Sequence, residues 1–372
     1  MAATVEMARS RSRLARALRD GLEARGYLEV ETPIAVPVAG QEPHLRPFET
    51  TFTPDLPVHA DGVAAPRSLH LQTSPEYAMK RLLARAPGFG RCYQLARVFR
   101  DGEISRTHNP EFTLLEFYAA PGDADAIMAD LEQLIAQAAF ALRGAMTAPA
   151  REGHGRGLKG PALSIEPPFE RLTCREAFAR YAGFDPLPLD TDALAQAART
   201  VGVRPSPGAS WDDLFAQVLL EKVEPALGLA RPTFLTGYPA SQAALAKLST
   251  RDPLVAERFE LYALGLELAN GFSELRDAAE QRARLEDEQR LRKSLGRAVF
   301  PLDEEFLAAL PRMPEAGGVA VGLDRLLMLL TGAKTIAEVL LFPAAGEYRF
   351  APLARLARLP TPPAPGVPGD AS

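Results

Sequence analysis

The fold is decided by residues 99–118, which have the sequence FRDGEISRTHNPEFTLLEFY. The runs 91–99 and 112–118 are rich in strand-forming residues, and the polar segment Arg100–Pro110 lies between them. This arrangement predicts an antiparallel, hairpin-like pair of strands joined by a long polar loop.

The second of these strands carries acids on both of its faces. Alternation places Glu111 and Thr113 on one face and Glu116 and Tyr118 on the other. Buried charge is costly unless it is paired, so these acids should meet a cation or a ligand. An exposed polar face on which the acids pair with Arg100 explains the same pattern, and the residues alone leave both interpretations open.

Outside this pair, helical and strand patterns occur in separate groups. Helices are expected at 14–22, from Ser74-Pro75-Glu76 onward, and at 123–143, 172–182, 190–200, 210–227, 277–295 and 324–330, with further strands at 27–31, 232–238, 257–268 and 319–323. Strands joined by hairpins, with helices grouped around them, predict an α+β fold with an antiparallel sheet flanked by helices. We expect one domain over 1–346, a linker or insertion at 144–168, and a proline-rich, disordered tail at 347–372.

The composition is that of a large globular chain. Its 372 residues are 47% hydrophobic, which is enough for one large core with or without a small insertion. A net charge of -5 gives no basic footprint of the kind that nucleic-acid binders carry. Cys92 and Cys174 are far apart and lack metal-type spacing, which predicts a reducing cytosol. No apolar run is long enough to cross a bilayer and no apolar segment follows the basic residues 1–13, so we expect a cytoplasmic protein without a membrane partner.

A second cluster of polar residues occurs at 267–274, where Glu267, Asn270 and Glu274 are spaced by three and four residues. Oxygen ligands of this kind suit Mg²⁺, which takes carboxylates together with phosphate oxygens. Asn270-Gly271 also indicates a turn, so the segment is equally compatible with a solvated loop.

A third cluster begins at Gly317-Gly318 and ends in an apolar helix pattern that contains Arg325. Glycines let the backbone approach a ligand closely, and an arginine near the core favours a planar anion such as a phosphate. A surface pair between Arg325 and Asp324 at a helix start is the alternative.

Taken in order, these clusters resemble the three motifs of class II aminoacyl-tRNA synthetases. Leu28–Pro33 is similar to motif 1, Phe99–Glu116 to motif 2, and Gly322–Arg325 to motif 3. The segments TSPEYAMKRL (73–82) and GLELANGFSEL (265–275) point further to the lysyl-tRNA synthetase group, and within it to the elongation factor P β-lysine ligases. The resemblance covers roughly residues 10–345.

The resemblance implies roles for individual residues. Arg100 would hold the α-phosphate of ATP, Arg325 its γ-phosphate, and Phe112 its adenine, and the first two would carry catalysis. The remaining expected ATP contacts are Asp101, Gly102, Glu103, His108, Asn109, Glu267, Leu268 and Gly322. Glu267 and Glu274 would hold Mg²⁺, and the expected amino-acid contacts are Ser74, Pro75, Glu76, Tyr118, Ala240, Asn270, Glu274 and Ala320. The family usually has Arg-Asn-Glu where this chain has Arg100-Asp101-Gly102-Glu103, which displaces the acid expected beside adenine.

The activity that this resemblance implies is ATP-dependent activation of (R)-β-lysine as an adenylate and its transfer to a lysine of elongation factor P. A homodimer with Pro33 at the interface is expected. An anticodon-binding domain is expected to be absent before motif 1, and the acidic balance also disfavours tRNA as a partner. A free-standing synthetase-like enzyme acting on another amino acid or acceptor, and an inactive amino-acid-binding regulator, are the alternatives.

Substrate choice is expected to depend on Ala320. The similar lysyl-tRNA synthetases have glycine at this place, so Ala320 adds one methyl group to the floor of the pocket. That methyl group would crowd the α-amine of lysine and leave room for a β-amine, and Ala240 supports the same shape. Plain strand packing without any effect on specificity is the alternative.

Overall fold

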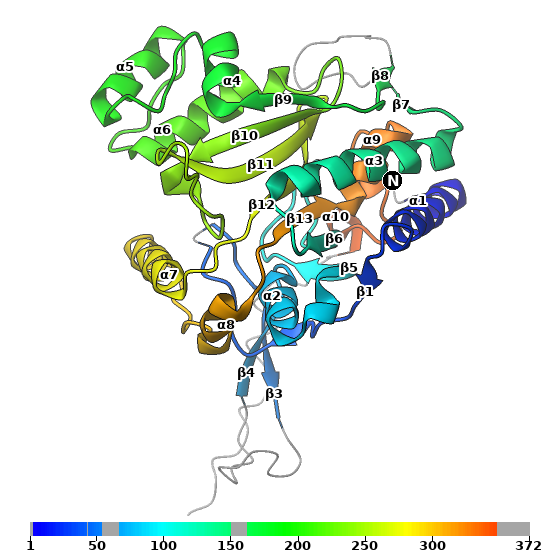
Figure 1. Ribbon diagram of the computed structural model, residues 1–372. Coiled ribbons are helices and arrows are strands. Elements are labelled where there is room, and N and C mark those ends of the chain that lie inside the picture. Colours follow the sequence, from blue (N-terminus) through cyan, green and yellow to red (C-terminus); the bar gives the residue numbers. More distant parts are fainter. Residues whose placement is uncertain (1–2, 43, 54–66, 150–161, 348–372) are drawn as a thin grey trace, which may run out of the picture.

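The computed structural model describes residues 3–42, 44–53, 67–149 and 162–347 (Figure 1). Most of the expected disordered tail and the middle of the expected 144–168 linker lie outside these described residues. The described ends of the linker contain a two-stranded ladder of β7 (Thr147–Ala148) and β8 (Leu163–Ser164).

An eight-stranded sheet forms the centre of the molecule, in the order β1-β5-β6-β13-β12-β11-β10-β9. In that order the strands are Leu28–Glu29, Arg91–Phe99, Glu111–Ala119, Gly317–Gly322, Leu266–Ser273, Val255–Ala263, Thr233–Pro239 and Glu170–Thr173. The two edge strands run parallel to their neighbours, and the strands between them are antiparallel. The predicted α+β class and the predicted β5–β6 pair are confirmed.

One face of this sheet is covered by α1 (Val5–Glu23), α3 (Ala124–Arg143) and α9 (Leu323–Thr331) (Figure 1). Leucines at helical spacing on α1 and α3 pack with Phe117 and Val321 of the sheet in the largest core cluster. Side chains one residue further along the same strands point to the opposite face. Glu116 and Tyr118 of β6 and Asn270 of β12 therefore lie on the face away from these three helices.

Three of the remaining helices lie at one end of the sheet. Figure 1 shows α4 (Cys174–Tyr181), α5 (Thr191–Thr200) and α6 (Trp211–Val218) beside β9 and β10, where they have a core cluster of their own. The other helices are α2 (Glu76–Arg85), α7 (Ala278–Ser294), α8 (Glu304–Ala309) and α10 (Ala344–Glu347). Of these, α2, α7 and α8 share a core cluster with Cys92 and Tyr118 of the strands β5 and β6. A small sheet of β2 (Ala35–Val36), β4 (Arg67–Leu71) and β3 (Glu49–Phe52) follows β1 along the chain. Every helix in the described ranges is too short or too polar to span a bilayer.

Several predicted elements differ from the structure. The expected strand at 257–268 is wrong, because the chain turns at Leu264-Gly265 and forms two antiparallel strands, β11 and β12. Asn270-Gly271 lies inside β12 and not in a turn. The expected helix at 172–182 begins only after the short strand β9, and the expected helix at 210–227 is regular only to Val218.

Candidate active site

A row of side chains crosses five strands on the face of the sheet opposite α1, α3 and α9. Strand register aligns Gln94 of β5 with Glu116 of β6, Glu116 with Ala320 of β13, Ala320 with Asn270 of β12, and Asn270 with Glu260 of β11. Neighbouring strands are about 4.8 Å apart, so these side chains stand side by side. Ala320 is therefore the single small apolar member of a polar row, directly between Glu116 and Asn270.

Glu116 lies at the centre of a buried acidic pocket. Its carboxylate accepts a hydrogen bond from the Tyr118 hydroxyl at 2.6 Å and one from the Ser74 hydroxyl at 2.8 Å. Only 1% of Glu116 is exposed. Ser74 also accepts a hydrogen bond from the backbone N–H of Glu76 at 3.1 Å, which fixes the start of α2 against the pocket. The predicted residues Ser74, Glu76 and Tyr118 are thus brought together, and Pro75 lies between the first two as the residue that precedes α2.

Lys80 joins two further carboxylates to this pocket. Its ammonium lies 2.6 Å from Glu76 and 2.5 Å from Glu274, and 1% of the residue is exposed. A methyl group on Gly318 would overlap both the Tyr118 ring and Oε1 of Glu274. The pocket floor therefore needs glycine at this position, because the acid and the ring lie directly over the backbone.

Burial raises the pKa of Glu116 to about 8, with a further contribution from Glu76. Burial also raises the pKa of Glu274 to about 8, although Lys80 opposes that shift. Three carboxyl groups share one lysine, so the ionised form of the pocket is short of positive charge. Such a pocket suits a ligand that brings ammonium groups.

A second buried network connects this pocket to β11. Arg258 donates hydrogen bonds to Glu260 and, at 3.3 Å, to the side-chain oxygen of Asn270. It also donates to the carbonyl of Gln242 at 3.0 Å, at the end of the short helical turn Ala240–Gln242. Arg258 thereby ties two predicted amino-acid contacts, Asn270 and the turn that holds Ala240, to one cation.

The other end of the same sheet face is cationic. Gly322 and Gly318 on β13 are four residues apart, so this end lies roughly 13 Å from the acidic pocket. Arg325, in the first turn of α9 after Gly322, donates to the Glu267 carbonyl at 3.0 Å and to its carboxylate at 3.1 Å. Its second terminal nitrogen lies 2.7 Å from Nε2 of His108.

The contact between Arg325 and His108 determines the protonation state of the imidazole. A guanidinium can only donate, so Nε2 of His108 accepts and its proton resides on Nδ1. Nδ1 lies 2.7 Å from the Ser105 hydroxyl, which can accept that proton in a hydrogen bond. Burial, followed by the charge of Arg325, lowers the pKa of His108, so the ring is neutral at neutral pH.

Arg100 approaches this end from the loop between β5 and β6. Its guanidinium carbon lies 5.0 Å from the centre of the Phe112 ring, and its closest acid, Glu103, is 3.8 Å away. Nε of Arg100 is buried without a hydrogen-bond partner among the described residues. Asp101 pairs with Arg46 at 2.6 Å and Gly102 forms the turn between it and Glu103. The predicted arginine is therefore close to its predicted aromatic neighbour and only weakly held by protein acids.

Two predicted ATP contacts have other partners in the structure. The Asn109 amide donates to the Glu111 carbonyl at 2.6 Å and accepts from the backbone of Ala344 at 2.9 Å. Leu268 is 2% exposed and belongs to the core cluster on the helix-covered face. A role for Leu268 would have to come from its backbone, and a role for Asn109 from holding the loop.

Comparison with known proteins identifies the family. The family model described as tRNA synthetases class II (D, K and N) matches residues 2–346. The chain belongs to this class II synthetase family. It is 41% identical to the elongation factor P–(R)-β-lysine ligase of Proteus mirabilis (strain HI4320) over 322 residues, which cover 86% of this chain and 89% of that protein. Ligases of the same name from Salmonella typhi and Salmonella arizonae are 41% and 42% identical over 321 residues, with the same coverage. The predicted family is confirmed.

The structure gives different partners to the two acids that were expected to hold Mg²⁺. Glu267 lies near the start of β12 and Glu274 directly follows its end, seven residues further on, which is roughly 23 Å of extended chain. Glu267 pairs with Arg325 and Glu274 with Lys80, so the two carboxylates cannot hold the same ion. Among the described residues, no group of three or more His, Cys, Asp or Glu side chains is placed to hold a metal.

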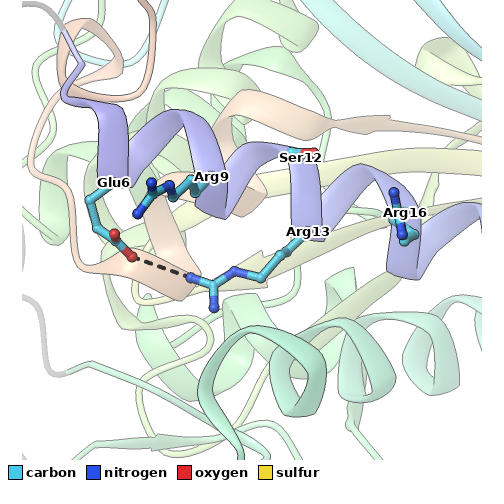
Figure 2. Close-up of a pocket in the computed structure, with 5 residues that line it drawn as sticks. All are labelled: Glu6, Arg9, Ser12, Arg13 and Arg16. Atoms are coloured by element: carbon cyan, nitrogen blue, oxygen red, sulfur yellow. Dashed lines mark hydrogen bonds and ion pairs between the residues drawn. The ribbon is translucent and has the colours of Figure 1, made fainter.

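A surface hollow lies on the exposed face of α1 (Figure 2). It is lined by Glu6, Arg9, Ser12, Arg13 and Arg16, all from this one helix. Since α1 covers the other face of the sheet, the hollow is separated from the polar row by the core. We assign the class II chemistry to the polar row and not to this hollow.

Lys80 and Arg258 are site residues that the sequence did not predict. Lys80 follows Glu76 by one helical turn, which is the pattern of an ordinary surface pair on a helix. Arg258 lies in β11, which was predicted as part of one longer strand at 257–268. Lys80 and Arg258 could have been identified by their positions among residues that are otherwise buried, because a buried cation implies nearby acids.

Proposed function

We propose that the chain activates (R)-β-lysine with ATP and transfers it to a lysine side chain of elongation factor P. Its relatives are named elongation factor P–(R)-β-lysine ligases. The observation that carries the proposal is the division of one sheet face into two parts. An acidic pocket around Glu116 and Glu274 suits ammonium groups, and a cationic end around Arg100 and Arg325 suits phosphates. A diammonium carboxylic acid and ATP would meet between the two parts.

The first step needs no protein base. The ionised carboxylate of the amino acid attacks the α-phosphorus of ATP, and pyrophosphate leaves with the electron pair of the broken P–O bond. Arg100, held only weakly by Glu103, is free to contact the α-phosphate. Arg325 exchanges its contact with Glu267 or His108 for the γ-phosphate. Catalysis then comes from positioning and from neutralising phosphate charge.

Mg²⁺ fits the cationic end through Glu267. Its carboxylate is partly exposed and lies beside the phosphate-binding Arg325. Mg²⁺ commonly takes one or two carboxylates and completes its shell with phosphate oxygens and water. When bound, the ion supplies further neutralisation of phosphate charge.

The second step requires a neutral amine. A free lysine side chain has a pKa of about 10.4, so the acceptor must lose a proton before it attacks the adenylate carbonyl and releases AMP. His108 is already tied to Arg325 and Ser105. We therefore propose that the acceptor lysine arrives neutral. We further propose a homodimer with Pro33 at its interface, acting in the cytoplasm where translation takes place.

The test is the intact mass of purified elongation factor P after incubation with this protein, ATP, Mg²⁺ and each lysine isomer. We expect a gain of one lysyl group with (R)-β-lysine, which disappears without ATP and with the Arg325→Ala variant. An unchanged mass together with aminoacylation of tRNA would support the synthetase-like alternative. An unchanged mass without any pyrophosphate exchange would support an inactive amino-acid-binding regulator.

A further inference from the structure

The loop between β2 and β3 is fastened to the active site from two sides. Arg292 of α7 is 2% exposed and donates to the carbonyls of Glu42 at 2.8 Å and of Leu45 at 3.1 Å. On the other side, Arg46 pairs with Asp101, the residue after Arg100, at 2.6 Å, and its carbonyl accepts from the backbone of Asp101 at 2.7 Å. The loop is therefore fixed between α7 and the phosphate-binding loop.

This loop presents a carboxylate that lacks a full set of partners. Oε2 of Glu42 is buried and has no hydrogen-bond partner among the described residues. The carboxylate lies over Gly40, where an added methyl group would overlap it. A buried acceptor without a partner is costly and is seldom kept without a reason. Arg292 uses its side chain on backbone carbonyls and not on this carboxylate.

The charged neighbours of Glu42 locate its carboxylate between the two parts of the site. Burial raises the pKa of Glu42; Glu76 raises it further, Arg100 and Arg292 oppose the shift, and Glu288 of α7 is a further acid that interacts with Glu42. Glu76 belongs to the acidic pocket and Arg100 to the cationic end. The ties between Arg46 and Asp101 hold the loop of Glu42 against the residue that follows Arg100. Because Glu76 also acts on Glu42, the loop faces the acidic pocket as well as the cationic end.

We propose that Glu42 binds the ammonium group of the amino acid that is nearest to its reacting carboxylate. This inference rests on the proposed function, because it assumes a diammonium substrate. The terminal ammonium enters the pocket of Glu116 and Glu274. The second ammonium then lies close to the reacting carboxylate, beside Glu42 and at the edge of Glu76. Glu42 is a specificity-determining residue that recognises the second ammonium group of the substrate and not the length of the substrate's carbon chain.

The test combines a variant with a truncated ligand. The Glu42→Gln variant keeps the shape of the side chain and removes its charge. 6-Aminohexanoate is (R)-β-lysine without its second ammonium. We expect Glu42→Gln to weaken the binding of (R)-β-lysine, measured by calorimetry, by roughly 10- to 100-fold, the range for a hydrogen bond between charged groups. Binding of 6-aminohexanoate should change by less than about threefold, since the partner of Glu42 is missing from that ligand.

Gly40→Ala is the second variant, because it displaces the carboxylate of Glu42 without removing it. It should show the same selective loss for (R)-β-lysine. The matched control is Glu49→Gln, which removes an exposed acid of the adjoining strand β3 and should leave both affinities unchanged. Thermal melting identifies any variant that fails to fold. If either Glu42→Gln or Gly40→Ala does not fold, the affinities of the other one test the proposal.

Two outcomes separate this inference from the proposed function. If the wild type binds neither ligand, the proposed function fails and takes the inference with it. If the wild type binds (R)-β-lysine and Glu42→Gln weakens both ligands equally or neither of them, Glu42 does not bind the second ammonium. The proposed function stands in that case.

Discussion

Binding of the amino acid should depend steeply on pH, because it competes with protons in the acidic pocket. Burial raises the pKa values of Glu116 and Glu274 to about 8, so below pH 8 the free pocket retains protons on these carboxyls. An arriving ammonium stabilises the ionised form and, because the two carboxyls interact, expels about one proton from the pair. One displaced proton costs about 1.4 kcal/mol per pH unit, which is tenfold in affinity. We expect the dissociation constant to fall about tenfold per unit between pH 6 and pH 7.5 and to level off above pH 8.

The same groups set the sign of the effect on stability. A carboxyl whose folded pKa lies above its unfolded value binds more protons in the folded state between those two values. The free protein should therefore lose stability as pH rises from about 4.5 to about 8 through Glu116 and Glu274. Bound amino acid offsets this loss. Its stabilising shift in melting temperature should accordingly be larger at pH 8 than at pH 6.

Calorimetry in two buffers of different ionisation enthalpy measures the number of protons released on binding. We expect about one proton at pH 7, shared between two interacting carboxyls, and a smaller number in Glu116→Gln. The control is Glu132→Gln, a buried glutamate that accepts the backbone N–H of Phe169 away from the pocket. A dissociation constant equal at pH 6 and pH 8, with no proton released, would refute the reasoning.

Three further results are expected. Arg100→Ala and Arg325→Ala should each slow ATP–pyrophosphate exchange by roughly 100- to 1,000-fold through loss of a phosphate contact, and exchange at the wild-type rate would remove these residues from the mechanism. Glu267→Gln should raise the Mg²⁺ concentration needed for exchange. Glu274→Gln should leave that concentration unchanged and raise the KM for the amino acid. The reverse pattern would indicate that Glu274 binds the metal. Light scattering at micromolar concentration should give the mass of a dimer, and a monomeric mass would count against an interface at Pro33.

The sequence predicted the centre of the fold well because the pattern there is local. Strong strand formers on both sides of a polar loop identify β5 and β6 without further information. The turn between β11 and β12 was missed because it is made by Leu264-Gly265, and leucine at a positive φ of 53° is no turn signal. Asn270-Gly271 has the usual turn sequence but is paired on both sides, with β11 and with β13. Pairing in the sheet overrides the local preference.

The sequence predicted those site residues that belong to recognisable motifs. Arg325 and Glu267 were both expected near the phosphates, and the structure places them in contact at 3.1 Å. The expectation of a shared metal site rested on a spacing of seven residues, which has no fixed meaning until the backbone is known. Seven residues turn through two turns of a helix but extend the length of a strand. Glu42 is separated in sequence from Glu76 by two strands and from Arg100 by three, so it forms no pattern with them before the chain is folded.

The preference for (R)-β-lysine over lysine should depend on the methyl group of Ala320. Register places Ala320 directly between Glu116 and Asn270, on the strand whose Gly318 is covered by Tyr118 and Glu274. A methyl group at this point narrows the passage from the acidic pocket to the phosphates. The amine of (R)-β-lysine is one carbon further from the carboxylate than that of lysine, so it avoids the narrow point. Ala320→Gly should admit lysine.

A difference of one methyl group in a pocket is worth about 1–3 kcal/mol, or roughly 10- to 200-fold in kcat/KM. We therefore expect the wild type to favour (R)-β-lysine within that range in amino-acid-dependent pyrophosphate exchange, and Ala320→Gly to reduce the ratio towards one. Ala269→Gly is the matched control, since it deletes the same group from β12 on the helix-covered face. It should lower stability and leave the ratio unchanged. Two results would show that Ala320 only packs the strand: a wild type that already favours lysine, or an Ala320→Gly ratio equal to that of the wild type. The position of the amine would then have to be selected elsewhere, and Glu42 would be the first residue to test.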